Sequence, residues 1–269
     1  MHIKLHYWGQ ISGRSMPLIY ILNHSKIDWE QIDLTIGPQD QAAWMAKKQK
    51  LIAQGFTFSN LPCLEVSGDN DQETYFVSQT NYCARFLGEK LGYDGKTEEE
   101  KRNLGQALVQ FEDFQKFWFE SIMTKKPKSQ EQDDQMKSKL PEMLMIFENC
   151  LNIFKKKFLI ADHLTTIDFL LFHWSNQMLK FKPSLFSSGY PLLEKWYSAM
   201  LNDESISETK KIHDSLPYTV QYKKVMKPMI EAMEKMPDGP QKEIMLIRMR
   251  NLPDLYYGTE DKGWDAVYE

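Results

Sequence analysis

The order of strand-like and helix-like segments is the feature that most constrains how this chain can fold. Up to about residue 91, short apolar segments alternate with helix-like ones, and a Ser-Gly-Asp-Asn-Asp turn at 67–71 separates the last two strand segments. The order read from this pattern is β-α-β-α-β-β-α, so the alternation ends in a hairpin. From about residue 97 to 209 only helical spacing recurs, as at Leu104 and Leu108. The chain is therefore predicted to join a small α/β unit to an all-α unit.

Turn residues and periodicity set the expected bounds. Thr165 and Asp168 have the layout of a capping box, with a hydroxyl at the N-cap and a carboxylate three residues later. We expect three regions: 1–91, 97–215 and an extension over 216–269. The expected strands cover 3–7, 27–34, 60–66 and 75–77, and the expected helices cover 17–22, 44–51, 80–91, 104–118, 133–158 and 169–179.

The extension at 216–269 is rich in methionine and aromatic residues. Met229, Met233 and Met236 form one apolar stripe if Pro228 begins a helix. Such a stripe has to be covered, so we expect the extension to be ordered and packed. Three alternatives stay open: the extension packs on its own helical unit, on the other subunit of a dimer, or on a separate protein. The last is plausible because methionines and aromatics suit adaptable interfaces.

Composition excludes several classes of function. With 33 Lys+Arg against 37 Asp+Glu the net charge is −4, which argues against a nucleic-acid partner. No apolar run approaches the roughly 18 residues that a spanning helix needs, and the first residues do not resemble a signal peptide. The three cysteines are far apart and odd in number, so we expect a reducing, cytoplasmic compartment. The histidines show no metal-ligand spacing, so no metal is expected. No cysteine occurs at 7–17, which disfavours cysteine-based thiol transfer.

Four stretches of sequence, in order and at compatible spacing, resemble the mu-like cytosolic glutathione S-transferases over roughly residues 3–205. That resemblance implies a thioredoxin-like N-terminal domain, an all-helical C-terminal domain and a homodimer. The stretches are Leu5-His6-Tyr7-Trp8, then Trp44 with Lys48, Lys50 and Leu51, then Asn60-Leu61-Pro62, and finally Gln79-Thr80-Asn81 with the linker at 95–101.

The resemblance places the catalytic hydroxyl on Tyr7, at the end of the first strand. Conjugation needs a thiolate, but a free thiol has a pKa of about 8.5. A tyrosine hydroxyl that donates a hydrogen bond to sulfur favours the anion. In related classes an arginine assists the thiolate, and Arg14 has a similar position after Gly13.

The same resemblance implies a glutathione site. Trp44 and Lys48 are expected to bind the glycyl carboxylate, with Trp8 as a further contact. The backbone at Leu61, before a cis Pro62, is expected to pair with the cysteinyl group. Gln79 and Thr80, at a helix N-terminus, suit the γ-glutamyl carboxylate because free amides and the helix dipole favour an anion. The expected binding residues are therefore Trp8, Arg14, Trp44, Lys48, Asn60, Leu61, Pro62, Gln79 and Thr80.

Three positions depart from the family pattern. Gly105 stands where an aspartate usually reaches across the dimer, while Gln41 and Ile19 each replace an arginine. We expect these changes to weaken glutathione binding more than they affect the fold. The resemblance implies conjugation of glutathione, as co-substrate, to a small electrophile whose identity the sequence does not give. The alternative is a weakly active structural or assembly subunit that docks through 216–269.

Overall fold

The computed structural model describes residues 1–9, 11–34, 38–53, 58, 60–68, 74–122, 130–181 and 183–216, and only the backbone at 38–43, 119–122, 130–137 and 181. The observed order of the first elements is the predicted β-α-β-α-β-β-α. The elements are β1 (His2–Trp8), α1 (Met16–Ser25), β2 (Trp29–Leu34), α2 (Pro38–Ala53), β3 (Cys63–Ser67), β4 (Thr74–Ser78) and α3 (Thr80–Leu91).

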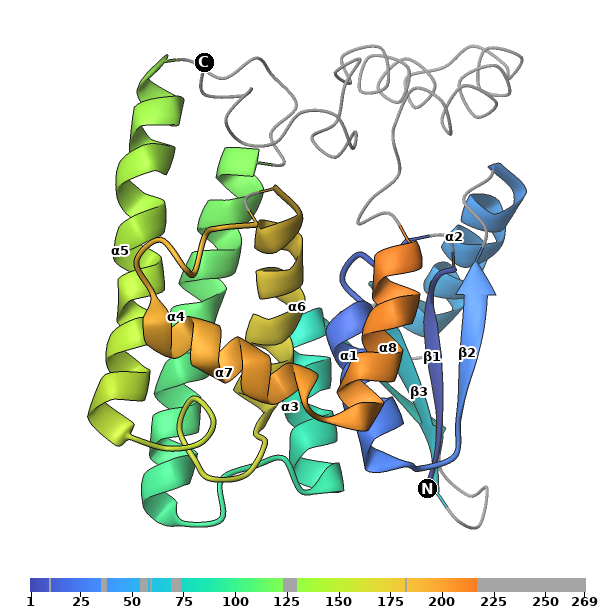
Figure 1. Cartoon of the computed structure of the whole chain (residues 1–269). Coiled ribbons are helices and arrows are strands. Elements are labelled where there is room, and N and C mark those ends of the chain that lie inside the picture. The colour runs from blue at the N-terminus through green and yellow to red at the C-terminus, as the bar shows by residue number, and fades with distance from the viewer. Residues whose placement is uncertain are drawn as a thin grey trace.

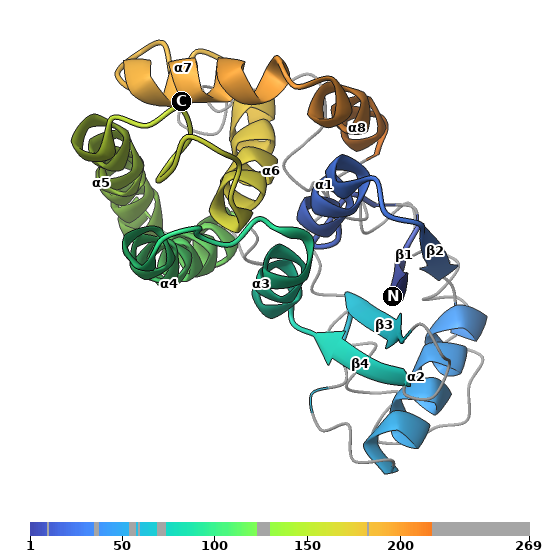
Figure 2. The same ribbon diagram turned by 90° about the horizontal axis from the view of Figure 1, so that it is seen from below.

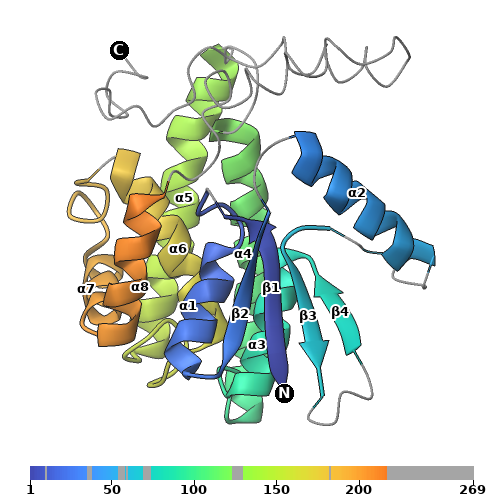
Figure 3. The same cartoon turned by 90° about the vertical axis from the view of Figure 1, so that its right-hand side faces the viewer.

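The four strands form one mixed sheet in the order β2-β1-β3-β4. β1 pairs in parallel with β2, with Ile3 opposite Trp29, and antiparallel with β3, with Leu5 opposite Leu64. β3 and β4 form the predicted hairpin. α1 and α3 cover one face of the sheet and α2 lies on the other (Figures 2 and 3). The parallel pair is joined by α1, as the crossover of such a pair requires.

The second half of the described chain is helical. It contains α4 (Glu98–Ile122), α5 (Gln130–Phe154), α6 (Thr166–Phe181), α7 (Pro191–Leu201) and α8 (Glu204–Ser215). The long helices α4 and α5 run side by side, and α6 lies between them and α1 (Figures 1 and 2). Nearly every residue from 164 to 178 is buried, so α6 is the central helix of this unit. The thioredoxin-like unit followed by a helical unit is therefore confirmed, whereas the exact domain limits stay a prediction.

The N-terminus of α6 corrects the predicted capping box in detail. The Asp168 carboxylate accepts from the Thr165 N–H at 2.9 Å, which is one half of the box. The Thr165 hydroxyl donates to the same carboxylate at 2.7 Å and so does not cap an amide. Asp168 also accepts from the Leu159 N–H and the Trp196 indole, each at 2.9 Å, and thereby ties α6 to the preceding loop and to α7.

Most predicted bounds differ from the structure by a few residues. The second and third strands begin at Trp29 and Cys63 and not at residues 27 and 60, and most of the helices are longer than predicted. Two of the differences at helix ends have a clear physical reason. α5 ends at Phe154 instead of residue 158, because Lys155 takes a left-handed φ of 52° that stops the helix. α1 begins one residue before the expected Pro17, which occupies an early position where its missing N–H is harmless. The methionine stripe and the predicted packing of 217–269 lie outside the described residues. None of the helices in the described part of the chain has the length and apolar character needed to cross a membrane.

Candidate functional site

Tyr7 lies near the C-terminal end of β1 and is only 6% exposed. Its phenolic oxygen accepts a hydrogen bond from the Arg14 backbone N–H at 2.9 Å. The loop between β1 and α1 passes close to the Tyr7 hydroxyl at Gly13. The φ of Gly13 is +36°, and a Cβ there would collide with that hydroxyl. Glycine is therefore required there on two grounds: backbone conformation and space. A phenolic oxygen can accept such a bond and still donate its own proton to a ligand.

A small apolar cluster surrounds this tyrosine, separate from the main core. It brings together four of the expected site residues, Tyr7, Trp8, Trp44 and Leu61, which come from three separate parts of the sequence. Its position between β1, α2 and the start of β3 leaves it next to the loop that carries Arg14. The cluster consists of buried Tyr7, Ile11, Trp44, Leu61 and Cys63, with the half-buried Trp8, Leu34 and Phe76 packed against it.

The turn before β3 holds the next expected residues. The Leu61–Pro62 peptide bond is cis, the geometry that the family resemblance implies. The Asn60 side chain accepts from the Leu61 N–H at 3.0 Å, so Asn60 shapes the turn itself. Leu61 is 9% exposed and its side chain belongs to the apolar cluster.

Gln79 and Thr80 lie where β4 passes into α3. Gln79 is exposed and has a φ of 71°, a conformation that non-glycine residues rarely adopt. Such backbone strain costs about 1–3 kcal/mol and tends to occur at binding sites. Thr80 is buried at the first position of the 12-residue helix α3. The helix N-terminus and the strained residue before it together form an anion-favouring corner.

α2 carries Trp44 and Lys48 one helical turn apart, so they share a face. Trp44 is buried in the apolar cluster, and Lys48 is half-buried beside it. The neighbouring Lys47 lies 3.4 Å from the Glu65 carboxylate on β3. The structure thus brings the aromatic and the cation of the expected carboxylate site together on one helix.

Sequence reasoning missed the ion pair between Lys47 on α2 and Glu65 on β3, which links α2 to the sheet. Glu65 accepts from His6 on β1 at 2.9 Å as well as from Lys47. Burial alone would raise the pKa of Glu65, but the bonds from His6 and Lys47 hold it below its usual range. Burial and the nearby Lys47 lower the pKa of His6. These residues lie on three separate elements, so no short-range spacing could have indicated the cluster.

Two of the three departures from the family pattern, Gly105 and Ile19, have described side-chain positions. A Cβ at Gly105 on α4 would have nothing within 4 Å, so the position is open but carries no carboxylate. Ile19 is buried in the main core. The Gln41 side chain lies outside the described residues. Arg14 is exposed, and its backbone N–H donates to the Tyr7 hydroxyl.

A surface cavity of about 730 Å³ lies elsewhere, between α1 and α8, and none of the expected site residues lines it. Four of the polar residues in its walls form hydrogen bonds with one another. His24 bonds to Asp203 at 3.2 Å, and Asn23 donates to Thr209 at 3.0 Å. We therefore place the candidate site at Tyr7 and not in this cavity.

Comparison with known proteins finds similar chains over most of this sequence. Residues 112–209 match the family model described as Glutathione S-transferase, C-terminal domain. The chain is 26% identical over 223 residues to Glutathione S-transferase Mu 2 of Macaca fuscata fuscata, covering 82% of this chain and 95% of that protein. It is 26% identical over 186 residues to Glutathione S-transferase Mu 1 of Mus musculus, covering 68% and 79%.

Solved structures show the same fold. The Pi-class glutathione S-transferase of Onchocerca volvulus superposes with a TM-score of 0.65 at 22% identity, covering 82% of this chain and 98% of that chain. A monomeric glutathione S-transferase of the hookworm Necator americanus gives 0.64 at 22% identity, covering 79% and 97%. The chain is therefore similar along most of its length to Mu-class glutathione S-transferases, its residues 112–209 match the C-terminal domain of the glutathione S-transferases, and it has the fold of these solved proteins.

Proposed function

We propose that this chain is a glutathione S-transferase, which conjugates the thiolate of glutathione to an electrophilic small molecule. The observation that carries the proposal is the placement of the Tyr7 hydroxyl, held by the Arg14 amide at 2.9 Å at the edge of the apolar cluster. Its relatives named as Mu-class glutathione S-transferases support the same activity.

Tyr7 would activate the thiol. A free thiol with a pKa of about 8.5 is mostly protonated at neutral pH. A hydrogen bond from the Tyr7 hydroxyl to sulfur stabilises the thiolate, and each unit of pKa lowering corresponds to about 1.4 kcal/mol. The thiol proton passes to solvent. The sulfur then forms a C–S bond with the electrophilic carbon, and in a substitution the leaving group departs with its electron pair.

The remaining expected residues would bind the three parts of glutathione from three places: α2, the turn before β3 and the N-terminus of α3. Trp44 and Lys48 on α2 bind the glycyl carboxylate through an indole N–H and an ammonium group. The Leu61 backbone pairs with the cysteinyl group, and Asn60 and Pro62 shape that turn. The N-terminus of α3, with Gln79 and Thr80, holds the γ-glutamyl carboxylate. Trp8 and Arg14 complete the site on the β1 side.

The wider setting of this function is also proposed. The helical unit would supply an apolar cleft over the sulfur for the electrophile, the protein would act as a cytoplasmic homodimer, and the reaction would serve detoxification. The alternative of an assembly subunit docking through the C-terminal extension gains no support from the described residues.

Calorimetry with glutathione tests the proposal directly. Wild-type protein should bind glutathione, and Lys48→Ala and Gln79→Ala should each weaken binding roughly tenfold through loss of one charged hydrogen bond. Lys50→Ala is the matched control, because Lys50 is an exposed lysine near the end of the same helix and should leave the affinity unchanged. Absence of binding by the wild-type protein would reject both the site and the function.

A further inference from the structure

α2 is the one described helix on its face of the sheet, and it lies away from the helical unit (Figures 2 and 3). The structure describes its side chains from Trp44 to Ala53, and of these Trp44 and Leu51 are the two that are buried. Apolar stabilisation grows with the area removed from water, so two side chains hold a 16-residue helix only weakly. α2 therefore depends on its polar contacts to keep its place.

The ion pair of Lys47 with Glu65 joins α2 to the sheet. Its nitrogen and oxygen are 3.4 Å apart, and the two side chains are 39% and 22% exposed, so the pair is partly shielded from solvent. The Lys47 ammonium also lies 5.9 Å from the centre of the Phe76 ring on β4. Water and salt screen such a pair less than they screen a fully exposed one.

The sheet fixes the carboxylate of Glu65 independently of α2. Along β3 the side chains alternate, so Cys63 and Glu65 share the α2 side of the sheet, while Leu64 belongs to the main core on the other side. His6 on β1 is 4% exposed, and its Nε2 lies 2.9 Å from the same carboxylate oxygen that Lys47 contacts. An ionised carboxylate only accepts, so His6 donates this bond. Two strands thus set the position of the oxygen that Lys47 meets.

Trp44 and Lys47 together fix how α2 is rotated about its axis. At about 100° per residue, Lys47 lies roughly 60° from Trp44 on one side, and Lys48 lies about 40° from Trp44 on the other side. A helix held at Trp44 alone is free to turn about that contact and to carry the Lys48 ammonium out of place. The second contact, at Lys47, prevents this turn.

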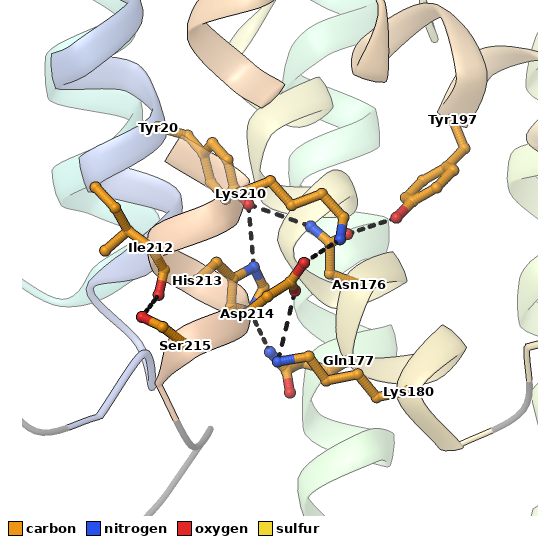
Figure 4. A network of polar contacts seen from close by, with 10 residues as sticks. All are labelled: Tyr20, Asn176, Gln177, Lys180, Tyr197, Lys210, Ile212, His213, Asp214 and Ser215. Carbon is orange, nitrogen blue, oxygen red and sulfur yellow. Dashed lines mark hydrogen bonds and ion pairs between the residues drawn. The ribbon is translucent and has the colours of Figure 1, made fainter. Parts of the chain in front are cut away.

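α8 shows how a helix is held when several polar contacts share the task. His213 lies 3.0 Å from the Tyr20 hydroxyl on α1 and also contacts the Gln177 amide on α6 (Figure 4). Asp214 pairs with Lys180 on α6 at 3.7 Å. Loss of one of these contacts leaves the others in place. In the described part of the chain a single ion pair joins α2 to the sheet, so the position of α2 is more sensitive to one substitution.

We propose that Glu65 is a positioning residue for glutathione binding: by holding α2 through Lys47, it places the Lys48 ammonium for the glycyl carboxylate. This inference rests on the proposed function and adds a residue that does not touch the ligand. Its effect is confined to the glycyl end of the tripeptide, because the cysteinyl and γ-glutamyl groups bind to other elements, the turn before β3 and the N-terminus of α3.

Calorimetry with glutathione and with glutathione amide tests the proposal. In the amide a neutral carboxamide replaces the glycyl carboxylate, so the ligand cannot form an ion pair with Lys48. Glu65→Gln should weaken glutathione binding about threefold to tenfold and should leave the affinity for the amide nearly unchanged. Glu30→Gln is the matched control, because Glu30 pairs with Lys4 within the sheet, also at 3.4 Å, and it should leave both affinities unchanged.

The direction of the change separates positioning from simple charge. Although burial raises it, the pKa of Glu65 is held below its usual range by the bonds from His6 and Lys47, so the side chain is a charged carboxylate at neutral pH. Removal of a negative charge near a site for an anion would by itself tighten binding. Weaker binding by Glu65→Gln therefore reports the loss of the position of α2.

Variants of Lys47 show whether the effect passes through the ion pair. Lys47→Met should weaken glutathione binding, whereas Lys47→Arg keeps the cation and should retain most of the affinity. Combining Lys47→Met with Glu65→Gln should weaken binding no further than the weaker single variant, because both changes break the same contact. Lys47 is partly exposed, so its variants also test the proposal if Glu65→Gln fails to fold.

Two sets of results would overturn this inference. Unchanged or tighter glutathione binding by Glu65→Gln, an equal loss for glutathione and its amide, or additive losses in the double variant would do so while leaving the proposed function intact. If the wild-type protein does not bind glutathione at all, the proposed function fails and this inference falls with it.

Discussion

The polar groups around Asp168 and those expected in the Tyr7 site differ in their exposure to solvent. Asp168 is completely buried, and its carboxylate accepts four hydrogen bonds from the protein itself. Among the polar residues expected in the site, by contrast, Arg14 and Gln79 are exposed and Lys48 is half-buried. Buried groups that bond to one another stabilise the fold, whereas a ligand can reach groups at the surface. Substitutions should therefore affect unfolding in the helical unit and activity in the thioredoxin-like unit.

The largest effect is expected at Asp168. Asp168→Ala leaves buried donors on Thr165, Leu159 and Trp196 without their acceptor, and we expect a loss of about 3–5 kcal/mol in the free energy of unfolding. Urea denaturation followed by circular dichroism measures this loss. Asp162→Ala, which removes an exposed carboxylate paired with Lys156, is the control and should change stability little. If the two variants lose the same free energy of unfolding, the buried hydrogen bonds of Asp168 do not stabilise the fold as expected.

Tyr7→Phe should show the opposite pattern. We expect the rate of conjugation to a generic electrophile to fall tenfold or more, because one charge-assisted hydrogen bond contributes about 1.5–3 kcal/mol. Glutathione affinity and the urea midpoint should change little. Steady-state kinetics and calorimetry on the same preparation separate these quantities. An unchanged rate would make Tyr7 a packed aromatic and turn attention to Arg14 or Ser12.

Local signals predicted the fold well, and the resemblance brought the site together. The turn at 67–71 predicted the hairpin, and helical spacing predicted the helical unit, because both signals act over a few residues. The predicted end of α5 was wrong. The helix stops at the left-handed Lys155, and nothing in a run of three lysines indicates which of them takes that conformation. The bonds of Asp168 to Leu159 and Trp196 were also missed, because they join residues distant in sequence.

The same limit applies to the site. Tyr7, Trp44 and Leu61 were grouped only by resemblance, and the structure shows that they share one apolar cluster. The contacts of His6 and of Lys47 with Glu65 depend on how separate elements pack. Neither contact has a spacing that sequence periodicity could detect. What sequence reasoning lacked was how elements distant in the sequence pack against one another.

Acid should destabilise the helical unit. Burial lowers the pKa of His173 to about 3 and lowers the pKa of His213 as well, whereas both would titrate near 6.5 when unfolded. Below that pH the unfolded chain binds protons that the folded chain does not, so stability is lost as pH falls. We expect a loss of about 1.4 kcal/mol per pH unit for each of these two histidines.

Urea unfolding between about pH 7 and pH 5 measures that slope. His213→Gln removes one of the two histidines, so the part of the slope due to this pair should fall by about half, whatever the absolute stability of the variant. A slope that the substitution leaves unchanged would show that other groups carry the acid sensitivity.

The smallest effect concerns two helical glycines, one at the junction of the units and one on an open surface. A Cβ at Gly105 on α4 meets nothing within 4 Å, whereas a Cβ at Gly88 on α3 would collide with the Thr166 hydroxyl at the start of α6. Gly105→Ala should raise the free energy of unfolding by about 0.5–1 kcal/mol, because alanine restricts the unfolded chain and suits a helix interior. Gly88→Ala should lower it by about 1–3 kcal/mol, because the two units could no longer approach as closely. Thermal unfolding of both variants checks the two signs. Stabilisation by both would mean that the junction between α3 and α6 is looser than the structure shows.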